Sequence, residues 1–315
     1  MVYDTSAIAL DGIDTDDHTF KISTDRQTRD LALSIRTVGL LQPCVLIAVG
    51  PFYRVVCGFR RIAACRALDL TTILARTLPP DLSLLACARI AISDNAYQRP
   101  LNVVEQSRAY ALIQQVAETS AAWPTVARAC GLADSGTAMA RLLPVASMPP
   151  TLQAAILSGD IALPIALRII RLSPGDARAL GHFYLRITTG LNKQRELWDL
   201  ITDISARDGI SIADLLAQEA IAAVVDDPDC PTPQKVERLR GTLKSMRFPE
   251  LVKAEADFQR NLKSLNLHPH IQLAPPPFFE GRSYRLTLTV DDRDGLSRLQ
   301  SELDRLIDHP NLLPR

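Results

Sequence analysis

Metal centres and disulfide frameworks need histidines and cysteines, of which this sequence has few, and a membrane span needs a long apolar run, which it lacks. Its 315 residues include five histidines and six cysteines, and no two cysteines form a C-x-x-C pair. Most of the cysteines lie in apolar segments, a pattern typical of reduced core thiols in a cytosolic protein. No N-terminal signal-like segment and no long uncharged apolar run is present. The sequence therefore predicts a cytoplasmic protein with no membrane span.

The sequence also lacks an excess of charge of either sign. Lys and Arg together number 35, and so do Asp and Glu, which gives a formal net charge of +0. Dedicated nucleic-acid binders usually carry a basic excess, so this balance counts against strong DNA affinity, although it is compatible with a local basic face. Walker A, G-x-S-x-G and HExxH patterns are absent too, so the common signatures of P-loop NTPases, serine hydrolases and zinc proteases are missing.

What is present is enough for two or three packed domains, because 47% of the residues are hydrophobic. Apolar runs at 45–49 and 53–56, separated by a turn, predict a hairpin, and a further strand is expected over 73–77. Apolar spacing predicts a helix over 84–93 and an almost entirely helical region over 103–222. These patterns predict an α+β fold class.

The composition predicts the domain boundaries as well. We expect an α+β domain over 1–115, a helical domain over 116–225, an acidic and proline-rich linker over 226–234, and a small α+β domain over 235–315. The last domain should contain helices over 234–246 and 249–265, strands around 270–274 and 283–290, and a final amphipathic helix over 293–308.

The stretch 57–66 is the most informative part of the chain. A predicted strand ends just before Gly58, and a helix with Ile62, Ala63, Cys65 and Ala67 facing inward is expected to follow it. Glycine allows close backbone approach, and the start of a helix presents free N–H groups to an anion. The paired arginines after the glycine add forked donors suited to phosphate oxygens. The pattern therefore predicts a nucleotide or phosphodiester site.

Three motifs in this order resemble those of ParB chromosome and plasmid partition proteins. The segment Gly58-Phe59-Arg60-Arg61-Ile62-Ala63-Ala64 is similar to the G-E-R-R-x-x-A box. Residues 33–43 match the S-I-x-x-x-G-L-x-Q-P segment, and residues 94–105 resemble E-N-x-Q-R-x-x-L-x-P-x-E with one extra residue inside. The resemblance implies a ParB/sulfiredoxin-like N-terminal domain, a helix-turn-helix-like middle and a C-terminal domain that pairs two copies.

The resemblance also implies a ligand, CTP with Mg²⁺. The nucleotide-binding residues carried over are Gln42, Gly58, Arg60, Arg61, Asn95, Gln98 and Arg99. The pair Asp94 and Asn95 takes the place of the family's metal-binding Glu-Asn, and a carboxylate with an amide oxygen suits a hard cation. Phe59 replaces the family's catalytic carboxylate, and phenylalanine neither orders water nor accepts a proton. Hydrolysis of CTP is therefore expected to be slow at most, and no catalytic residue is assigned.

The helical middle has the spacing of a helix-turn-helix motif at 124–132. DNA-binding residues expected from the resemblance are Thr125, Arg128, Ser135, Thr137 and Arg141. Within the expected recognition helix Arg141 is the one basic residue, and Asp134 opposes phosphate, so we expect weak or nonspecific DNA binding.

The final helix predicts how the chain assembles. Leu296, Leu299, Leu303 and Leu306 form an apolar stripe that predicts a homodimer.

Three functions are consistent with this sequence. The first is a nucleotide-gated, DNA-associated protein of partition or of chromosomal or mobile-element regulation, with a ParA-type ATPase as a candidate partner. The second is a nucleotide-dependent protein scaffold without a DNA role. The third is a ParB-fold enzyme, a nuclease or a small-molecule kinase. The sequence leaves open the identity of the nucleotide, the DNA site and the partner of the C-terminal domain.

Overall fold

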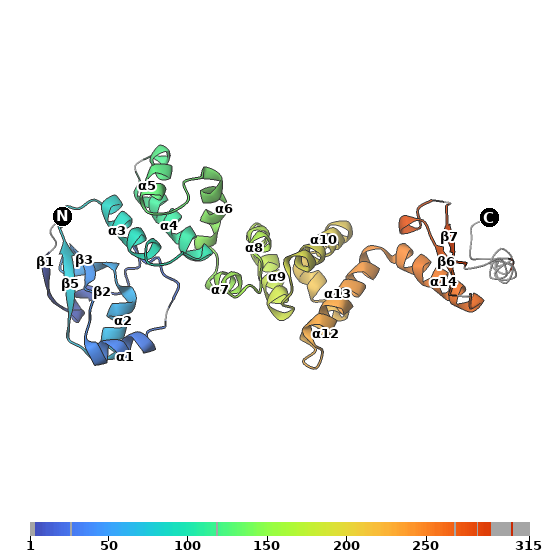
Figure 1. Ribbon diagram of the computed structural model, residues 1–315, viewed down its shortest axis with the longest axis horizontal. Helices are drawn as coiled ribbons and strands as arrows, with labels where there is room; N and C mark the ends of the chain where they lie inside the picture. Colours follow the sequence, from blue (N-terminus) through green and yellow to red (C-terminus); the bar gives the residue numbers. More distant parts are fainter. Residues whose placement is uncertain are drawn as a thin grey trace. The chain divides into compact units, whose positions relative to one another are not determined.

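The computed structural model describes residues 4–25, 27–117, 119–267, 269–281 and 283–290, together with residue 304. The chain falls into two compact units, Met1–Ile170 and Arg171–Arg315. Both contain helices and strands, so the predicted α+β class is confirmed (Figure 1). The finer domain boundaries expected from the sequence stay predictions.

A five-stranded sheet forms the centre of the first unit. Its strands are β1 (Asp4–Ala9), β2 (Ile13–Asp14), β3 (Cys44–Val49), β4 (Phe52–Cys57) and β5 (Thr72–Leu78), in the order β1-β5-β3-β4-β2. The predicted hairpin is confirmed, because β3 and β4 pair antiparallel around a turn at Gly50. Strand β5 returns parallel to β3 and pairs with β1 at the edge. Strands β1 and β5 thus pair although they lie far apart in the sequence, with Asp4 opposite Thr77.

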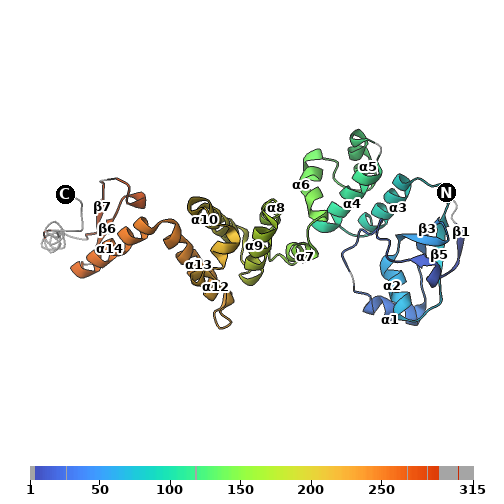
Figure 2. The same cartoon turned by 180° about the vertical axis from the view of Figure 1, so that it is seen from behind.

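Helices cover both faces of this sheet (Figures 1 and 2). They are α1 (Arg29–Val38), α2 (Phe59–Ala67), α3 (Leu84–Ala96) and α4 (Val103–Val116), and the 3-10 helix η1 (Leu10–Gly12) joins β1 to β2. Leu46 and Val55 belong to a buried cluster with residues of α1 and α2. The next residues along the strands, Ile47 and Val56, belong to a cluster with α3 and α4. Alternation along the strands thus builds two cores, one on each face.

The inward face of α2 differs in part from the prediction. Ile62 and Cys65 are buried as expected, but Ala63 and Ala67 are exposed and Ala64 is buried instead. Positions 62 and 65 are three residues apart and share one face of the helix, whereas position 64, two residues after Ile62, lies on nearly the opposite side from Ile62 and is buried there. The apolar character of alanine therefore did not by itself identify the side of the helix that faces the sheet.

Short helices complete the first unit. They are η2 (Ser120–Ala122), α5 (Trp123–Ala129), α6 (Gly136–Ala146), α7 (Pro150–Ser158) and α8 (Leu163–Ile169). The buried side chain of Gln153 in α7 donates to the carbonyls of Val145, Ala146 and Met148. The same side chain accepts a 3.1 Å hydrogen bond from Arg108 of α4. Gln153 thus joins the end of α6 to α4.

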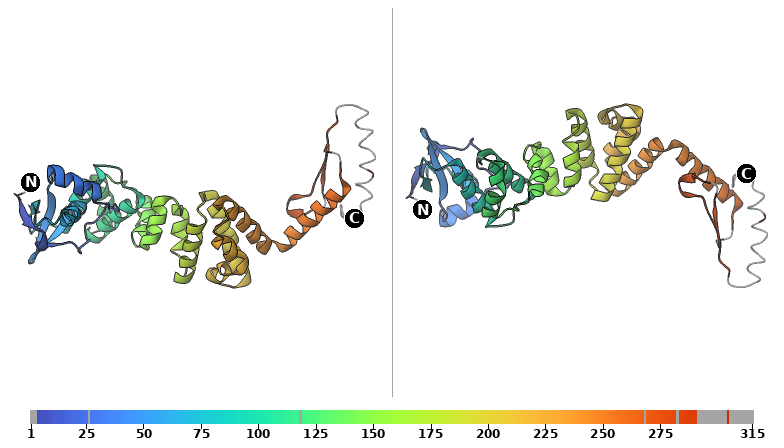
Figure 3. Two further views of the ribbon diagram at one scale, coloured as in Figure 1. Left: turned by 90° about the horizontal axis from the view of Figure 1, so that it is seen from below. Right: turned by 90° about the horizontal axis from the view of Figure 1, so that it is seen from above.

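The second unit is mostly helical. It contains α9 (Pro174–Arg186), α10 (Leu191–Asp208), α11 (Ile212–Leu216), α12 (Glu219–Asp226), α13 (Thr232–Arg247), α14 (Pro249–Leu265), β6 (Ile271–Ala274), η3 (Pro277–Phe279) and β7 (Arg285–Leu288). The helices and strands expected over 234–290 are therefore confirmed. Strand β6 pairs antiparallel with β7 beside α14 (Figure 3). Buried Phe258 of α14 packs with Ile271 and Leu273. The helix expected over 293–308, with its leucine stripe, lies outside the described residues.

The acidic, proline-rich stretch 226–234 joins two helices of the second unit. Lys235 in α13 is buried, and its ammonium donates a 2.9 Å hydrogen bond to the carbonyl of Val225 in α12. That contact fixes α12 against α13. Among the described helices, none is both long and apolar enough to span a membrane.

Candidate functional site

A pocket of about 250 Å³ lies where β4 ends and α2 begins. All eight residues that the sequence placed in a nucleotide and metal site line it: Gln42, Gly58, Arg60, Arg61, Asp94, Asn95, Gln98 and Arg99. They come from three separate stretches of the chain, and a fourth stretch, residues 20–25, forms another part of the wall. The sheet and α3 thus bring together the residues that the sequence analysis selected.

Gly58 begins α2 in a conformation that other residues rarely adopt. Its φ is +102°, and a Cβ atom at this position would lie 2.8 Å from Sγ and 3.1 Å from Cβ of Cys44. Both the dihedral angle and the buried cysteine therefore require glycine here. The first turn of α2, with its unpaired N–H groups and its positive dipole end, faces this pocket without a side-chain cap.

Arg60 and Arg61 are held in different ways. Arg60 donates to the carbonyl of Gln27 at 2.8 Å and forms a 3.0 Å ion pair with Asp25, and both charged side chains are about two-fifths exposed. Arg61 is 16% exposed and donates at 3.0 and 2.9 Å to the carbonyls of Gln42 and Pro43. An anion could exchange with the carboxylate on Arg60, whereas Arg61 is already fixed in place by two backbone carbonyls.

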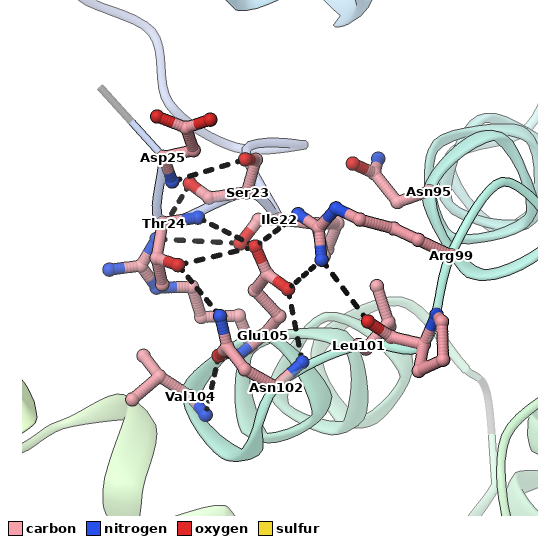
Figure 4. Close-up of polar contacts among 12 residues, drawn as sticks. Ile22, Ser23, Thr24, Asp25, Asn95, Arg99, Leu101, Asn102, Val104 and Glu105 are labelled. Carbon is pink, nitrogen blue, oxygen red and sulfur yellow. Dashed lines mark hydrogen bonds and ion pairs between the residues drawn. The ribbon is translucent and has the colours of Figure 1, made fainter. Parts of the chain in front are cut away.

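Arg99 is held by a buried carboxylate (Figure 4). Its two terminal nitrogens donate at 2.7 Å to the two carboxylate oxygens of Glu105, whose side chain is 0% exposed. The backbone N–H of Thr24 donates to the same carboxylate at 2.9 Å, and that of Asn102 at 3.1 Å. Arg99 lines the pocket, but its forked donors are committed to this bidentate contact.

Glu105 is the important residue that the sequence analysis missed, because the resemblance over residues 94–105 assigned it no role in the site. It forms a capping box with Asn102 at the start of α4, and its bond to Thr24 joins α4 to the pocket wall 81 residues away. Burial alone would raise the pKa of Glu105. The hydrogen bonds from Arg99, Thr24 and Asn102 outweigh burial and lower that pKa to about 2. The Asn102-x-x-Glu105 spacing was the available signal.

Asp94 faces Arg61 and Gln98. One carboxylate oxygen lies 3.7 Å from Nη2 of Arg61, and the other accepts a 3.2 Å hydrogen bond from Nε2 of Gln98. Asn95 donates its amide N–H to the carbonyl of Ala91 at 2.8 Å. Within the described residues, no group of three or more His, Cys, Asp or Glu is placed to hold a metal ion. This donor set fits Mg²⁺, which needs few protein ligands when phosphate and water supply the rest.

No thiol of the pocket is set up for chemistry. Cys57 lines the pocket but is 2% exposed. Burial raises the pKa of its thiol, and the charge of nearby Asp94 raises it further. A thiol held in its protonated form is a poor nucleophile, so the structure offers no support for thiol chemistry at Cys57.

The expected DNA-binding residues all lie exposed on α5 and α6 and the turn between them: Thr125, Arg128, Ser135, Thr137 and Arg141. Two of them already make contacts within the protein. Ser135 accepts a 3.4 Å hydrogen bond from the N–H of Ala138 and so caps α6. Arg128 pairs with Asp134, with Nε donating at 2.7 Å. The neighbouring carboxylate thus balances the charge of Arg128.

Comparison with known proteins identifies the N-terminal region. Residues 6–96 match the family model of the ParB N-terminal domain. The chain is 33% identical over 153 residues to the chromosome-partitioning protein Spo0J of Thermus thermophilus, covering 48% of this chain and 54% of that protein. It is 29% identical over 149 residues to a nucleoid occlusion protein of Shouchella clausii, covering 47% of this chain and 50% of that one. The chain thus spans about half the length of these curated relatives.

Solved structures of ParB proteins resemble the chain more distantly. A C-terminally truncated ParB of Caulobacter crescentus complexed with CTP-γ-S has a TM-score of 0.28 and 23% identity, covering 56% of this chain and 92% of that one. A Pnob8-like ParB-N domain has a TM-score of 0.37 and 13% identity, covering 76% and 98%. The family assignment rests on the sequence matches, which cover the strands and helices that build the pocket. Residues 6–96 are therefore assigned to the family of the ParB N-terminal domain, and the chain is similar in sequence to partition proteins over about half of its length.

Proposed function

We propose that this protein binds CTP with Mg²⁺ in the pocket at the start of α2 and associates with DNA in partition or in the regulation of a chromosomal or mobile element. The observation that carries the proposal is the convergence of eight motif residues from three stretches of the chain on one pocket. The names of the curated relatives, which are partitioning and nucleoid occlusion proteins, support the DNA role.

Each side chain has a role that follows from its contacts. Phosphate oxygens would lie against the first turn of α2, where Gly58 lets them approach the backbone. Arg60 would exchange Asp25 for phosphate, since that ion pair is exposed. Arg61 would donate from its fixed position, and Asp94 would hold Mg²⁺ between itself and the phosphates.

Turnover is proposed to be slow or absent. The pocket-lining carboxylates are Asp25 and Asp94, and each already pairs with an arginine. Phe59 occupies the position where the family has its carboxylate, and an aromatic ring does not activate water. Phosphate release, followed with and without DNA, should stay near the buffer rate. Brisk steady release that persists in Phe59→Ala would contradict this assignment.

Calorimetry with CTP, ATP, GTP and UTP in the presence of Mg²⁺ tests nucleotide binding. Arg61→Ala should weaken binding of the preferred nucleotide by about 1.5–3 kcal/mol, because it removes charge-assisted bonds to phosphate. Arg76→Ala is the matched control, since Arg76 lies exposed on β5 outside the residues that line the pocket. If the wild-type protein binds none of the four nucleotides, the proposal is wrong.

The pairing of Arg128 with Asp134 favours a second candidate, a nucleotide-dependent scaffold that has no DNA role. The two candidates differ in one measurement. A DNA-associated protein binds duplex DNA with an affinity that falls steeply as salt rises, because bound phosphates release counterions. A scaffold shows no such binding at physiological salt, with or without CTP.

Homodimerisation through 235–315 is also a proposal. After α13, the described part of this region has a small hydrophobic cluster of three buried residues, Phe258, Ile271 and Leu273, and a small core is stabilised by pairing with a second copy. Light scattering on the full chain and on a chain ending at Val225 should give a dimer and a monomer.

A ParA-type ATPase is the candidate partner, and pull-down with and without CTP tests it.

A further inference from the structure

A second cavity borders the nucleotide pocket and shares two side chains with it. It has a volume of about 320 Å³ and is lined by Thr15, His18, Lys21, Val55, Phe59, Ile62, Ala63 and Arg66. Lys21 and Phe59 line both this cavity and the nucleotide pocket, so they form the wall between the two. Neither the motifs nor the charge pattern of the sequence drew attention to Lys21.

Lys21 differs in kind from the other cations of the first unit. It is the single lysine among residues 1–170, where all other basic side chains, apart from histidine, are arginines. Arginine offers a rigid planar fork, whereas lysine is a compact point charge on a flexible stem whose three donors rotate. A point charge suits the end of a phosphate chain, because the terminal group carries the most charge and has no fixed plane.

Phe59 holds this ammonium at the pocket. The Nζ atom of Lys21 lies 5.7 Å from the centroid of the Phe59 ring and 3.4 Å from Nε2 of His18. The His18 ring lies 6.2 Å from the same Phe59 centroid. A cation over an aromatic face is attracted by the ring's quadrupole. A carboxylate at position 59 would instead attract the ammonium as an ion partner and repel a terminal phosphate.

We propose that Lys21 binds the terminal phosphate of the nucleotide and that Phe59 positions it there, so that the pocket distinguishes a triphosphate from a diphosphate. The proposal rests on the proposed nucleotide site and adds to it a residue and a basis for selectivity. Compared with the family's carboxylate, Phe59 gives the pocket one negative charge fewer, and its ring also holds the ammonium of Lys21. The pocket would then bind the triphosphate without hydrolysing it.

Calorimetry with CTP, CDP and CMP plus Mg²⁺ on the full chain tests this selectivity. Lys21→Met keeps the length and apolar stem but loses the charge, and it should weaken CTP binding about tenfold while CMP binding stays unchanged. Phe59→Leu should move the CTP-to-CDP ratio in the same direction by a smaller factor. Lys193→Met, which removes a lysine of the second unit that pairs with Glu237, is the control and should change nothing.

A chemical readout is possible because Lys21 is alone in its unit. Amine acetylation followed by mass spectrometry should show that CTP slows modification of Lys21, while CMP does not, with Lys193 as the internal reference. If the wild-type protein binds no nucleotide, the proposed function itself fails. If it binds CTP but Lys21→Met weakens all three nucleotides equally, or none of them, the site stands and the role of Lys21 is wrong.

Discussion

The two arginine–carboxylate pairs Arg99–Glu105 and Arg128–Asp134, both in the first unit, differ mainly in the burial of the carboxylate, since Arg99 itself is 46% exposed. Glu105 is 0% exposed and accepts bonds from Arg99, Thr24 and Asn102. Arg128 is 78% exposed and Asp134 is 39% exposed. The pair with the buried carboxylate lies at the pocket proposed to bind nucleotide and joins α4 to the wall of that pocket, whereas the exposed pair lies in the turn expected to meet DNA.

Burial decides what each pair can do. The Glu105 carboxylate has no access to water, so its charge depends on the donors around it, and the contact with Arg99 is therefore fixed. An exposed pair in water contributes little, so a phosphate can replace Asp134 beside Arg128 at small cost. The side chains at the proposed nucleotide pocket are therefore held in place before a ligand binds. In the turn expected to meet DNA, Arg128 can exchange Asp134 for a phosphate.

The largest effect is expected for Glu105→Ala, which deletes the buried partner. It leaves two backbone N–H groups without their acceptor, whereas the half-exposed Arg99 can turn to water, and we expect a loss of about 2–5 kcal/mol in the free energy of unfolding. Urea unfolding followed by circular dichroism measures it. Asp134→Ala is the matched control and should leave the urea midpoint unchanged. Equal effects of the two substitutions would mean that burial does not distinguish the pairs.

The loss of folding stability at low pH should depend on the same carboxylate, that of Glu105. The pKa of Glu105 is lowered from 4.5 to about 2 in the folded chain, so its stabilisation is complete above the unfolded pKa and is lost as pH falls through the folded pKa. The stabilisation amounts to about 3 kcal/mol by the shift in pKa. Urea midpoints at pH 5, 4, 3 and 2 should fall more steeply in the wild type than in Glu105→Gln. Parallel curves would show that Glu105 titrates normally.

Sequence alone predicted the composition of the pocket but not how its charges pair. The strand, glycine, paired arginines and helix could be read locally, and the structure places all eight selected residues around one pocket. The bond from Thr24 to Glu105 spans 81 residues, and β1 meets β5 from the far end of the domain. Such contacts depend on the tertiary fold, which hydrophobic periodicity and secondary-structure propensity do not predict. Ala63 is a second example. The spacing of apolar residues in α2 predicted that it faces inward, but it is exposed.

A smaller effect is expected for Gly58→Ala. Its φ of +102° and the 2.8 Å approach to Cys44 Sγ make any side chain costly, by about 1–3 kcal/mol of stability. Nucleotide binding should weaken as well, because α2 must shift to relieve the contact. Gly241→Ala is the control, since this glycine lies within α13 with nothing within 4 Å of an added Cβ. It should raise stability by up to about 1 kcal/mol.

The smallest effect is expected on DNA binding, and it tests the exposed pair directly. Asp134→Asn removes the competing carboxylate, so Arg128 should bind phosphate more readily and nonspecific affinity should rise about two- to fivefold at low salt. Arg128→Ala should reduce the slope of log affinity against log salt by about one phosphate contact, and Arg141→Ala by a similar amount. Fluorescence anisotropy with a random-sequence duplex, measured between low and physiological salt, gives both quantities. If Asp134→Asn leaves affinity and slope unchanged while Arg141→Ala lowers both, Arg128 lies off the DNA path, and Arg141 is the contact that α6 provides. If none of the three substitutions changes binding, α5 and α6 do not meet DNA, and the scaffold becomes the better description of this protein.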